Sequence, residues 1–136
     1  MSGRYLLDTN IIIALFSRQA SVLNGLSQAK EIFVPSVALG ELYYGAQKSG
    51  RPQQNLARLA SFAAERTILN CDENTSAQYG EIKNKLRLKG RPLPENDVWI
   101  ASLAIQYHLT LATRDAHFKQ VDNLRTELWE QAIKFS

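Results

Sequence analysis

The chain has 136 residues, of which 45% are hydrophobic, and this length predicts one domain over residues 1–136 and excludes two ordinary domains. No apolar run is long enough to span a bilayer, since the run from Ile11 to Phe16 is too short, so we expect no contact with a membrane. The net charge is +3, from 16 basic and 13 acidic residues, and it becomes +7 when the four acidic residues discussed below are set aside. A basic surface suits a polyanion, although the same charge also serves solubility alone.

The N-terminus and the cysteine content indicate the compartment. The first residues, MSGRYLLDTN, lack the long apolar region and the small-residue cleavage site of a secretory signal, so we expect a cytoplasmic protein. Cys71 is the only cysteine, which excludes an internal disulfide and a cysteine-based zinc site and fits a reducing compartment. We interpret Cys71 as a small, buried hydrophobic residue.

Short apolar runs alternate with amphipathic stretches along the chain, without internal repeats. In chain order, the pattern predicts a strand at residues 4–7, a helix at 11–17, a strand at 31–34, a helix from Ser36 through Glu41, a helix at 55–65, a strand at 67–69, a helix at 75–88, a helix from Asn96 through Tyr107 and a strand at 110–113. This order predicts an α/β fold with a mainly parallel central sheet flanked by helices.

Capping and helix-breaking residues set several of these boundaries. The Ser36 hydroxyl can accept from an unpaired backbone N–H, so we expect Ser36 to be an N-cap. Gly90 is expected to end the helix at residues 75–88, and Pro92 and Pro94 prevent its continuation. The sequence from Asn123 onward fits a strand and a helix equally well.

Four acidic residues lie where an apolar segment meets a turn or a helical face of small residues. They are Asp8 in YLLDTN, Glu41 in PSVALGELYYG, Asp97 in LPENDVWIASLA and Asp115 in LTLATRDAHF. In open parallel sheets, ligands bind outside the carboxyl ends of the strands, where Asp8 and Asp115 both fall. The pattern predicts one carboxylate cluster assembled from distant parts of the chain.

Taken singly, three of these acids have simpler structural explanations. Asp8 could cap the helix that follows it, Asp97 could be a first-turn acid favoured by the helix dipole, and Asp115 could form a turn after a strand. The prediction therefore depends on their joint arrangement.

Glu41 is harder to explain structurally. At helical spacing its carboxylate shares an arc with small and apolar neighbours, which are Val37, Ala38, Tyr44 and Gly45. An unpaired charge is costly there, so we expect Glu41 to face a cation or a partner. Asp97 similarly shares its face with Ala101 and Ala104, which leaves space beside its carboxylate.

Several carboxylates brought together repel one another unless a cation binds among them. Oxygen ligands without a supporting cysteine or histidine cluster select a hard ion, Mg²⁺ or Mn²⁺, and disfavour zinc. One or two such ions, about 3.5–4 Å apart if there are two, can activate water and stabilise the leaving oxygen of a phosphodiester. The cluster therefore predicts metal-dependent phosphodiester hydrolysis with water as the nucleophile.

These residues resemble the PIN-domain ribonucleases, and within them the VapC-type toxins of type II toxin-antitoxin systems. The resemblance is carried by LLDTN, PSVALGELYYGA, RLKGRPLPENDVWIASLA and LATRDAHF, in the family's order and over nearly the whole chain. Asp8, Glu41 and Asp97 resemble the three main acidic positions of the PIN site, with Asp8 and Asp97 the most direct metal ligands. Asp115 matches the fourth, more variable position.

The resemblance also assigns supporting residues. Thr9 or Asn10, together with Thr113, resemble the polar residues that orient a carboxylate or a bound water, and such groups fix ligand geometry. Arg114 lies between the strand end and Asp115, where it either contacts a phosphate or is an ordinary surface arginine. No acidic ligand is missing, so the resemblance implies an active enzyme.

The resemblance further implies substrate and partners. It implies an endoribonuclease that cleaves RNA, with transfer RNA the first candidate substrate, and so inhibits translation. It implies a homodimer and a higher assembly with a VapB-like antitoxin protein, whose C-terminal segment occupies or blocks the acidic cleft. The toxin-antitoxin complex is expected to bind operator DNA, mainly through the antitoxin.

A basic segment, residues 83–91 (KNKLRLKGR), leads directly into LPEND. One hypothesis is that Arg87, Lys89 and Arg91 hold the RNA backbone beside Asp97. The alternative is a solvated helix face, because Lys and Arg near a helix C-terminus are favourable without any ligand. The hypothesis predicts that replacing the three with serine weakens RNA binding and flattens its salt dependence.

Three aromatic residues, Tyr43, Tyr44 and Trp99, fall on predicted helices. We interpret them as core or subunit-interface residues, with stacking on RNA bases as the alternative.

Two other functions compete with the ribonuclease prediction. A non-catalytic nucleic-acid-binding or regulatory module would use the acids structurally, and retention of all four argues against it. A phosphotransferase of the haloacid dehalogenase type would need a second aspartate two residues after Asp8, where this chain has Asn10. A metal-dependent endoribonuclease is therefore the preferred interpretation.

Overall fold

The structure, a computed structural model, describes residues 3–130. Its five strands form one sheet in the order β3-β2-β1-β4-β5, and every neighbouring pair is parallel. The strands are β1 Arg4–Leu7, β2 Glu31–Pro35, β3 Thr67–Leu69, β4 Thr110–Thr113 and β5 Thr126–Leu128. The predicted α/β fold with a parallel central sheet is therefore confirmed.

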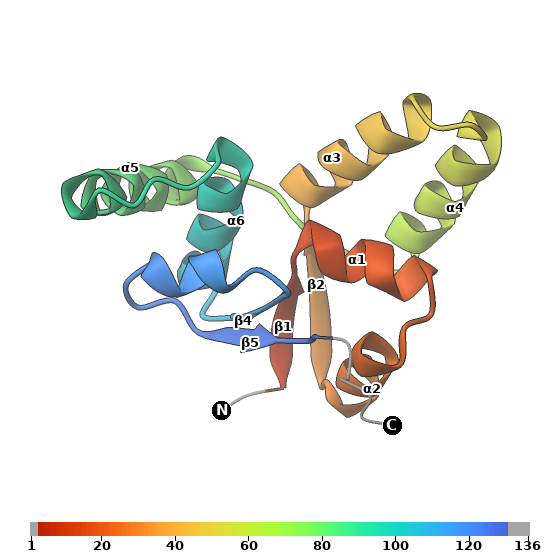
Figure 1. The fold of residues 1–136 in the computed structure, drawn as a ribbon, viewed down its shortest axis with the longest axis horizontal. Coiled ribbons are helices and arrows are strands. Elements are labelled where there is room, and N and C mark those ends of the chain that lie inside the picture. The colour runs from red at the N-terminus through yellow and green to blue at the C-terminus, as the bar shows by residue number, and fades with distance from the viewer. Residues whose placement is uncertain (1–2, 131–136) are drawn as a thin grey trace, which may run out of the picture.

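Within residues 3–130, six α-helices and one 3₁₀ helix connect and cover the strands. They are α1 Thr9–Phe16, α2 Ala20–Gln28, α3 Ser36–Gln47, α4 Pro52–Ala64, α5 Glu73–Lys89, α6 Glu95–Gln106 and the 3₁₀ helix η1 Ala116–Gln120. In Figure 1, α5 and α6 form one arm and α3 and α4 form another, on either side of the carboxyl end of β1. The acidic segments predicted from the sequence meet between these arms.

The core is built around the two central strands and α6. All four residues of β4 are buried, as are the last three of β1, which is the pattern of strands covered on both faces. In α6 the buried stretch from Val98 to Ala104 is interrupted only at Trp99. Because α6 is so deeply packed, the direction of its first turn, which carries Asp97, is fixed by the core.

Several boundaries follow the expected residues. As expected, Gly90 ends α5, and it does so in the left-handed region with φ +68°, where glycine meets no steric penalty. The start of α5 differs from the prediction: it begins at Glu73 instead of residue 75, after a reciprocal capping box of Asp72 and Thr75. The strands at residues 67–69 and 110–113 have the predicted bounds.

Other sequence-based expectations are wrong. Pro35, not Ser36, is the N-cap of α3, and no side chain caps that helix. The helix predicted at residues 55–65 begins at Pro52, whose missing N–H costs nothing in a first turn. Cys71 is exposed, not buried. The ambiguous stretch after Asn123 contains the strand β5, and residues 131–136 lie outside the described part of the chain.

Helix α2 was not predicted. In its sequence, ASVLNGLSQ, only Val22 is buried, and Leu26 packs against the core from a partly buried position. Its place is set by a close approach of Gly25 to Trp129, where a Cβ on Gly25 would lie 2.7 Å from the indole. Within residues 3–130, no helix is both long and apolar enough to cross a membrane.

Candidate active site

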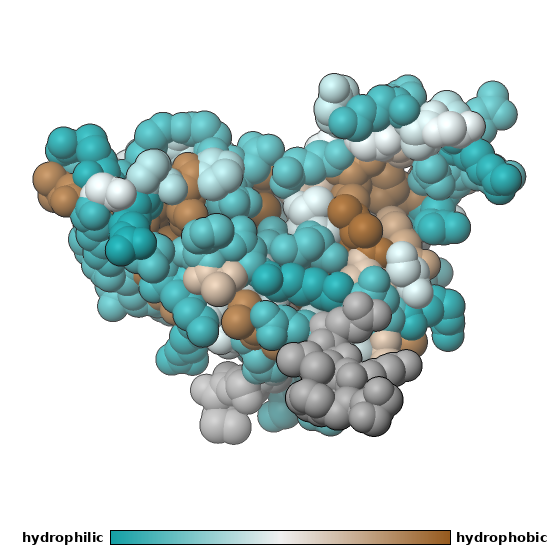
Figure 2. Space-filling model, in the orientation of Figure 1, coloured by the Kyte–Doolittle hydropathy of each residue, from teal (hydrophilic) through white to brown (hydrophobic). Residues whose placement is uncertain are grey.

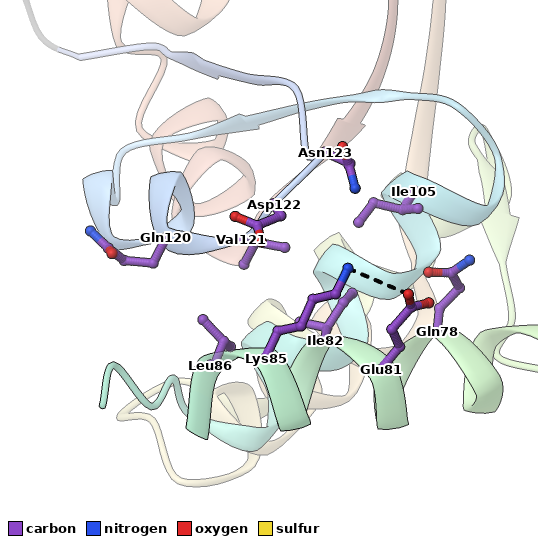
Figure 3. A pocket seen from close by; sticks show the side chains of 10 residues that line it. All are labelled: Gln78, Glu81, Ile82, Lys85, Leu86, Ile105, Gln120, Val121, Asp122 and Asn123. Atoms are coloured by element: carbon purple, nitrogen blue, oxygen red, sulfur yellow. Dashed lines mark ion pairs between the residues drawn. The ribbon is translucent and has the colours of Figure 1, made fainter. Parts of the chain in front are cut away.

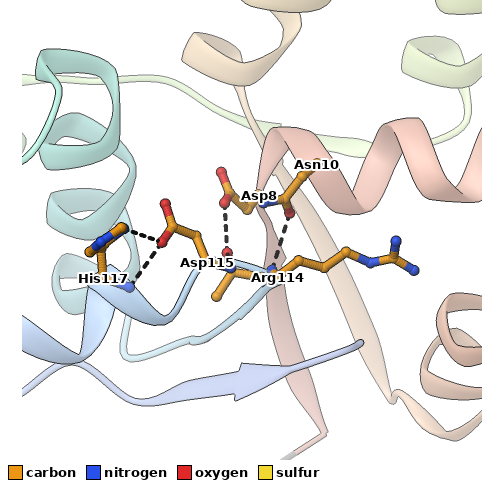
Figure 4. Close-up of polar contacts among 6 residues, drawn as sticks. Asp8, Asn10, Arg114, Asp115 and His117 are labelled. Carbon is orange, nitrogen blue, oxygen red and sulfur yellow. Dashed lines mark hydrogen bonds and ion pairs between the residues drawn. The ribbon is translucent and has the colours of Figure 1, made fainter. Parts of the chain in front are cut away.

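Asp8 lies directly after β1 and is only 5% exposed. Its Oδ2 accepts a 2.7 Å hydrogen bond from the Thr113 hydroxyl at the end of β4, and its Oδ1 accepts a 2.8 Å bond from the Thr9 backbone N–H. The second bond caps α1, so the structural explanation for Asp8 holds as well. Two neighbouring parallel strands thus fix one carboxylate at their shared carboxyl edge (Figure 4).

The environment of Asp8 disfavours its charged form. Burial raises the pKa of the Asp8 carboxyl above its usual value, and the hydrogen bonds from Thr113 and Thr9 oppose that shift only in part. The nearby charges of Glu41 and Asp115 raise the pKa further. Asp8 is therefore a buried carboxylate that a cation would stabilise.

Asp97 lies in the first turn of α6 and is half-buried. Burial raises its pKa to about 6, helped by the charges of Asp8, Asp115 and Glu41, while His117 acts in the opposite direction. No side-chain hydrogen bond within residues 3–130 involves the Asp97 carboxyl group. The most perturbed acid of the site is thus held in place by its helix alone, with its oxygens free to bind.

Glu41 and Asp115 flank this pair, and each is engaged by a neighbour. Glu41 accepts a 2.8 Å hydrogen bond from the Thr9 hydroxyl. Asp115 accepts from the backbone N–H of His117 at 2.9 Å and lies 2.8 Å from the His117 imidazole Nδ1 (Figure 4). Its turn with His117 starts η1, so the turn-forming role considered for Asp115 is also real.

The four acids share one electrostatic environment without closing around one point. Asp8 and Asp97 each have a pKa raised by the other acids. In the described part of the chain, however, no three Asp, Glu, His or Cys side chains converge closely enough to hold one metal ion as they stand. Glu41 and Asp115 are turned toward Thr9 and His117 instead.

The donor set nevertheless fits a hard divalent cation. It offers carboxylate oxygens from four segments, and neither Asp8 nor Asp97 has an ion pair within residues 3–130. Like charges gathered in a partly buried place are costly until a cation neutralises them. Glu41 and Asp115 belong to the same donor set, because the charges of both acids contribute to the raised pKa of Asp97.

The supporting residues make three different contacts. Thr113 holds Asp8 and Thr9 holds Glu41, while the Asn10 amide oxygen accepts from the Arg114 backbone N–H at 3.3 Å. The Arg114 side chain points away from Asp115 (Figure 4). Its guanidinium donates to the Trp129 carbonyl at 2.9 Å and to the Ser21 hydroxyl at 3.2 Å.

Arg114 therefore has a structural function that the sequence did not indicate. It ties the end of β4 to α2 and to the residue after β5. These two hydrogen bonds describe the role of Arg114 better than either earlier alternative, a phosphate contact or an ordinary surface arginine.

Most of the basic segment at residues 83–91 is already paired. Lys83 contacts Glu95, Lys85 lies 3.4 Å from Glu81, and Lys89 lies 2.6 Å from Asp122. Figure 3 shows the pair on α5, with Lys85 turned along the helix toward Glu81. The structure thus resembles the solvated helix face more than a free basic arm.

Two cations of this segment lack a carboxylate partner in the described region. Arg87 donates to the Asn84 amide oxygen at 2.8 Å, and Arg91, which is exposed, makes no side-chain hydrogen bond within residues 3–130. Any binding of this segment to RNA is therefore expected to depend on Arg87 and Arg91 rather than on Lys89.

His117 is the site residue that the sequence did not predict. Its side chain is 80% exposed and bonded to Asp115, and its charge lowers the pKa of Asp97. Its spacing, two residues after Asp115, is the signal that could have identified it, since an aspartate at a strand end commonly binds the backbone two residues on.

Most of the chain is similar to a known protein family. Residues 5–124 match the PIN domain. The chain belongs to the PIN-domain family. Within it, this PIN domain is a VapC-type endoribonuclease, since it is 38% identical over 129 residues to the ribonuclease VapC2 of Haemophilus influenzae, covering 93% of this chain and 98% of that one.

Two further proteins are similar to this chain over most of its length. The tRNA(fMet)-specific endonuclease VapC of Shigella flexneri is 37% identical over 130 residues, which cover 93% of this chain and 98% of that one. The crystal structure of VapBC2 from Rickettsia felis, bound to a DNA fragment from its promoter, contains a chain that superposes with a TM-score of 0.86 at 34% identity. The match covers 93% of this chain and 98% of that one.

Proposed function

We propose that this protein is a Mg²⁺- or Mn²⁺-dependent endoribonuclease, working as the toxin of a toxin-antitoxin pair and cleaving transfer RNA. The observation that carries the proposal is the pair Asp8 and Asp97, two carboxylates that are partly or fully buried and have raised pKa values. Asp8, Asp97, Glu41 and Asp115 would hold the metal. The whole of residues 1–136 would act as one domain.

In this proposal, each residue has a defined task in hydrolysis of the phosphodiester. Thr113 and the Thr9 N–H orient Asp8, the packed helix α6 holds Asp97, and the Thr9 hydroxyl positions Glu41. A bound divalent ion would neutralise the carboxylates and supply positive charge to the phosphate and the leaving oxygen. Water attacks the phosphorus atom, and the bond to the leaving oxygen breaks.

The test is cleavage of purified transfer, messenger and ribosomal RNA with Mg²⁺, with Mn²⁺ and with EDTA. We expect discrete cuts in transfer RNA with either metal and none with EDTA, and we expect Asp8→Asn and Asp97→Asn to abolish them. Cleavage that persists in both variants would assign the activity to a contaminant. Metal-independent binding without any cleavage would favour the non-catalytic nucleic-acid-binding alternative.

An apolar groove beside the acids supports a protein partner. It encloses about 460 Å³ between α1, α3 and α4, and its lining includes Ile13, which is 53% exposed. Figure 2 shows the brown, apolar surface beside α1 and α4. Thr9 and Glu41 also line this groove, so an apolar segment of a VapB-like antitoxin seated there would reach the carboxylates and block them.

Gly45 gives a direct test of this groove. It lines the groove, and a Cβ added to it would meet no atom within 4 Å, so Gly45→Leu would fill the groove without displacing the fold. We expect Gly45→Leu to bind the cognate antitoxin at least tenfold more weakly. Unchanged antitoxin binding would move the partner surface elsewhere.

The assembly of the proposed complex can be measured separately. By resemblance, the toxin would form a homodimer, and with its antitoxin it would form a higher assembly that binds operator DNA through the antitoxin. Light scattering of the toxin alone, and gel-shift measurements of the complex with its own promoter fragment, test the two parts. A monomeric toxin would remove the dimer from the proposal and leave the cleavage site unaffected.

A further inference from the structure

A second groove opens on the other side of the catalytic acids. It holds about 800 Å³ between α3, the loop after β3 and the first turn of α6, a volume within the usual range for small-ligand sites. Glu41 lines both this groove and the apolar one. A molecule in the second groove would therefore touch the edge of the carboxylate site at Glu41.

The walls of this groove carry the chemistry that recognises an unpaired nucleotide. On one wall, Tyr44 of α3 is 67% exposed and has the Lys48 ammonium 4.8 Å from its ring centroid. On the other wall lie Asn70 and Asn96, exposed amides that make no side-chain hydrogen bond within residues 3–130. Each amide offers both a donor and an acceptor, the groups that read base edges.

The aromatic side chains are arranged for stacking. The Trp99 indole lines the groove and is stacked on the Tyr79 ring, with centroids 4.1 Å apart, so one of its faces is already covered and its orientation is fixed. The exposed Tyr44 ring contradicts the interpretation of this residue as part of the core. Sequence-specific RNA recognition typically splays single bases onto such rings.

Charge is distributed along the groove as a nucleotide requires. Among the described residues, Glu41 is the only acid that lines it, and Glu41 belongs to the proposed metal site, so a phosphate at that end would lie against the metal. Lys48, beside Tyr44, has no ion pair within residues 3–130 and can meet the next phosphate. The groove thus carries the Glu41 carboxylate of the proposed metal site and, beside the exposed Tyr44 ring, has the Lys48 ammonium next to it.

We propose that this groove binds the unpaired nucleotide next to the scissile phosphate, with Tyr44 stacking on its base and Asn70 and Asn96 reading its edge. The inference rests on the proposed function, because Glu41 joins the groove to the carboxylate site. It assigns cleavage-site selection to α3 and to the loop after β3.

Substitutions that fill or strip the groove test this assignment. Gly40 lines it, and a Cβ there would meet no atom within 4 Å, so Gly40→Leu fills the groove without strain. Gly80→Leu on α5 is the matched control, because Gly80 is an equally open helical glycine outside the groove. Tyr44→Ala removes the ring, Tyr44→Phe keeps it, and Asn70→Ala removes one amide.

The readout is cleavage of a stem-loop RNA library with a randomised loop, sequenced at the cut ends. We expect Tyr44→Ala to raise KM by about tenfold, Tyr44→Phe to restore it, and Asn70→Ala to relax base preference at one position beside the cut. Gly40→Leu should lose selection, and Gly80→Leu should match the parent. An unchanged cleavage profile in all groove variants would overturn the assignment.

Cys71 supplies a readout that does not depend on turnover. It is the only cysteine, it is exposed, and it lines the groove. In the Asp97→Asn protein, saturating loop RNA should slow maleimide labelling of Cys71 at least fivefold, whereas equal labelling rates with and without RNA would reject nucleotide binding in the groove.

Two further outcomes distinguish failure of the groove assignment from failure of the proposed metal-dependent site. If Gly40→Leu or Tyr44→Ala shifts the sedimentation of the protein to a smaller species, the groove is an interface between copies of this chain, and the nucleotide assignment falls. If the parent cuts no RNA, the proposed metal-dependent site fails first and the groove assignment fails with it. Cleavage by the parent with unaltered profiles in the variants rejects the groove alone.

Discussion

The acid cluster and the basic segment at residues 83–91 differ in whether their charged side chains have partners of opposite charge. Three of the five cations in the basic segment contact carboxylates within residues 3–130, and all of them are exposed. The acids Asp8 and Asp97 are partly or fully buried, are surrounded by like charges and have no ion pair in the same region. Exposed pairs contribute little to stability, whereas buried like charges are costly. Uncompensated charge, rather than a high density of charge, therefore marks the site.

The largest effect is expected from removing the charge of Asp97. Asp97→Asn keeps the side-chain shape but loses a proposed metal ligand, so cleavage should fall about a thousandfold, the equivalent of about 4 kcal/mol. The same variant should melt at a higher temperature than the metal-free parent, because it relieves the repulsion with Asp8. A lower melting temperature would show that Asp97 and Asp8 do not repel each other in the folded protein.

Thr113 tests whether orientation of Asp8 matters. Its hydroxyl donates to Asp8 at 2.7 Å, so Thr113→Val should lower cleavage by about 10- to 100-fold, the usual cost of losing a group that orients a ligand. Thr113→Ser keeps the hydroxyl and should recover most of the activity. Thr110→Val, at the buried first residue of the same strand, is the control, and an equal loss there would indicate a general weakening of β4.

The stability of the folded protein should depend on pH through Asp97. The pKa of Asp97 is raised from 3.8 to about 6 in the folded protein, so between these values the folded state binds more protons than the unfolded state. The Asp97 contribution should therefore reduce stability as the pH rises from about 4 to about 6, and stay constant above that. The Asp97 contribution is the difference in the free energy of unfolding between the metal-free parent and Asp97→Asn, measured by chemical denaturation at each pH. If the difference in the free energy of unfolding did not change with pH, the raised pKa of Asp97 would be contradicted.

Mg²⁺ should act in the same pH window with the opposite sign. Since the metal binds the ionised carboxylates, its stabilising effect should grow as the pH rises through about 6 and should be nearly absent at about pH 4. Thermal melting with Mg²⁺ and with EDTA at both pH values checks this. A Mg²⁺ effect of equal size in Asp97→Asn would place the ion elsewhere.

The smallest effects are expected in the basic segment. Lys85→Ser and Lys89→Ser remove cations that are already paired, so RNA binding and its salt dependence should barely change. Arg87→Ser with Arg91→Ser should weaken binding modestly and reduce the salt slope by about 0.7 for each phosphate that the variant no longer neutralises. If the paired lysines prove the more sensitive set, the ion pairs open on RNA binding and the contrast between the two regions is wrong.

Local sequence was sufficient for the elements that depend on local chemistry. The strands at residues 67–69 and 110–113, the glycine stop at Gly90 and the parallel sheet follow from hydrophobic runs and backbone preferences. Asp8 and Asp115 follow strands and Asp97 lies in a first helical turn, and such segments meet at one edge of this kind of sheet. Glu41 lies in the second turn of α3.

Features that depend on distant residues could not be predicted. Helix α2 is positioned by Trp129, which is far along the chain from Gly25. The Arg114 side chain turns to Ser21 and to the Trp129 carbonyl, and Lys89 finds Asp122. Hydrophobic periodicity cannot predict such contacts between distant side chains, because it indicates only which face of a helix or strand is apolar.

The hydrogen bond between Thr113 and Asp8 joins residues 105 positions apart, and this separation has a consequence for timing. Strand β1 emerges from the ribosome early, but its partner β4 cannot pair with it until Thr113 has been synthesised. Since long-range pairing is closed late in folding, a nascent chain that already carries Asp8, Glu41 and Asp97 has no oriented site. The orientation of Asp8 by Thr113 is therefore completed only after that strand has been made.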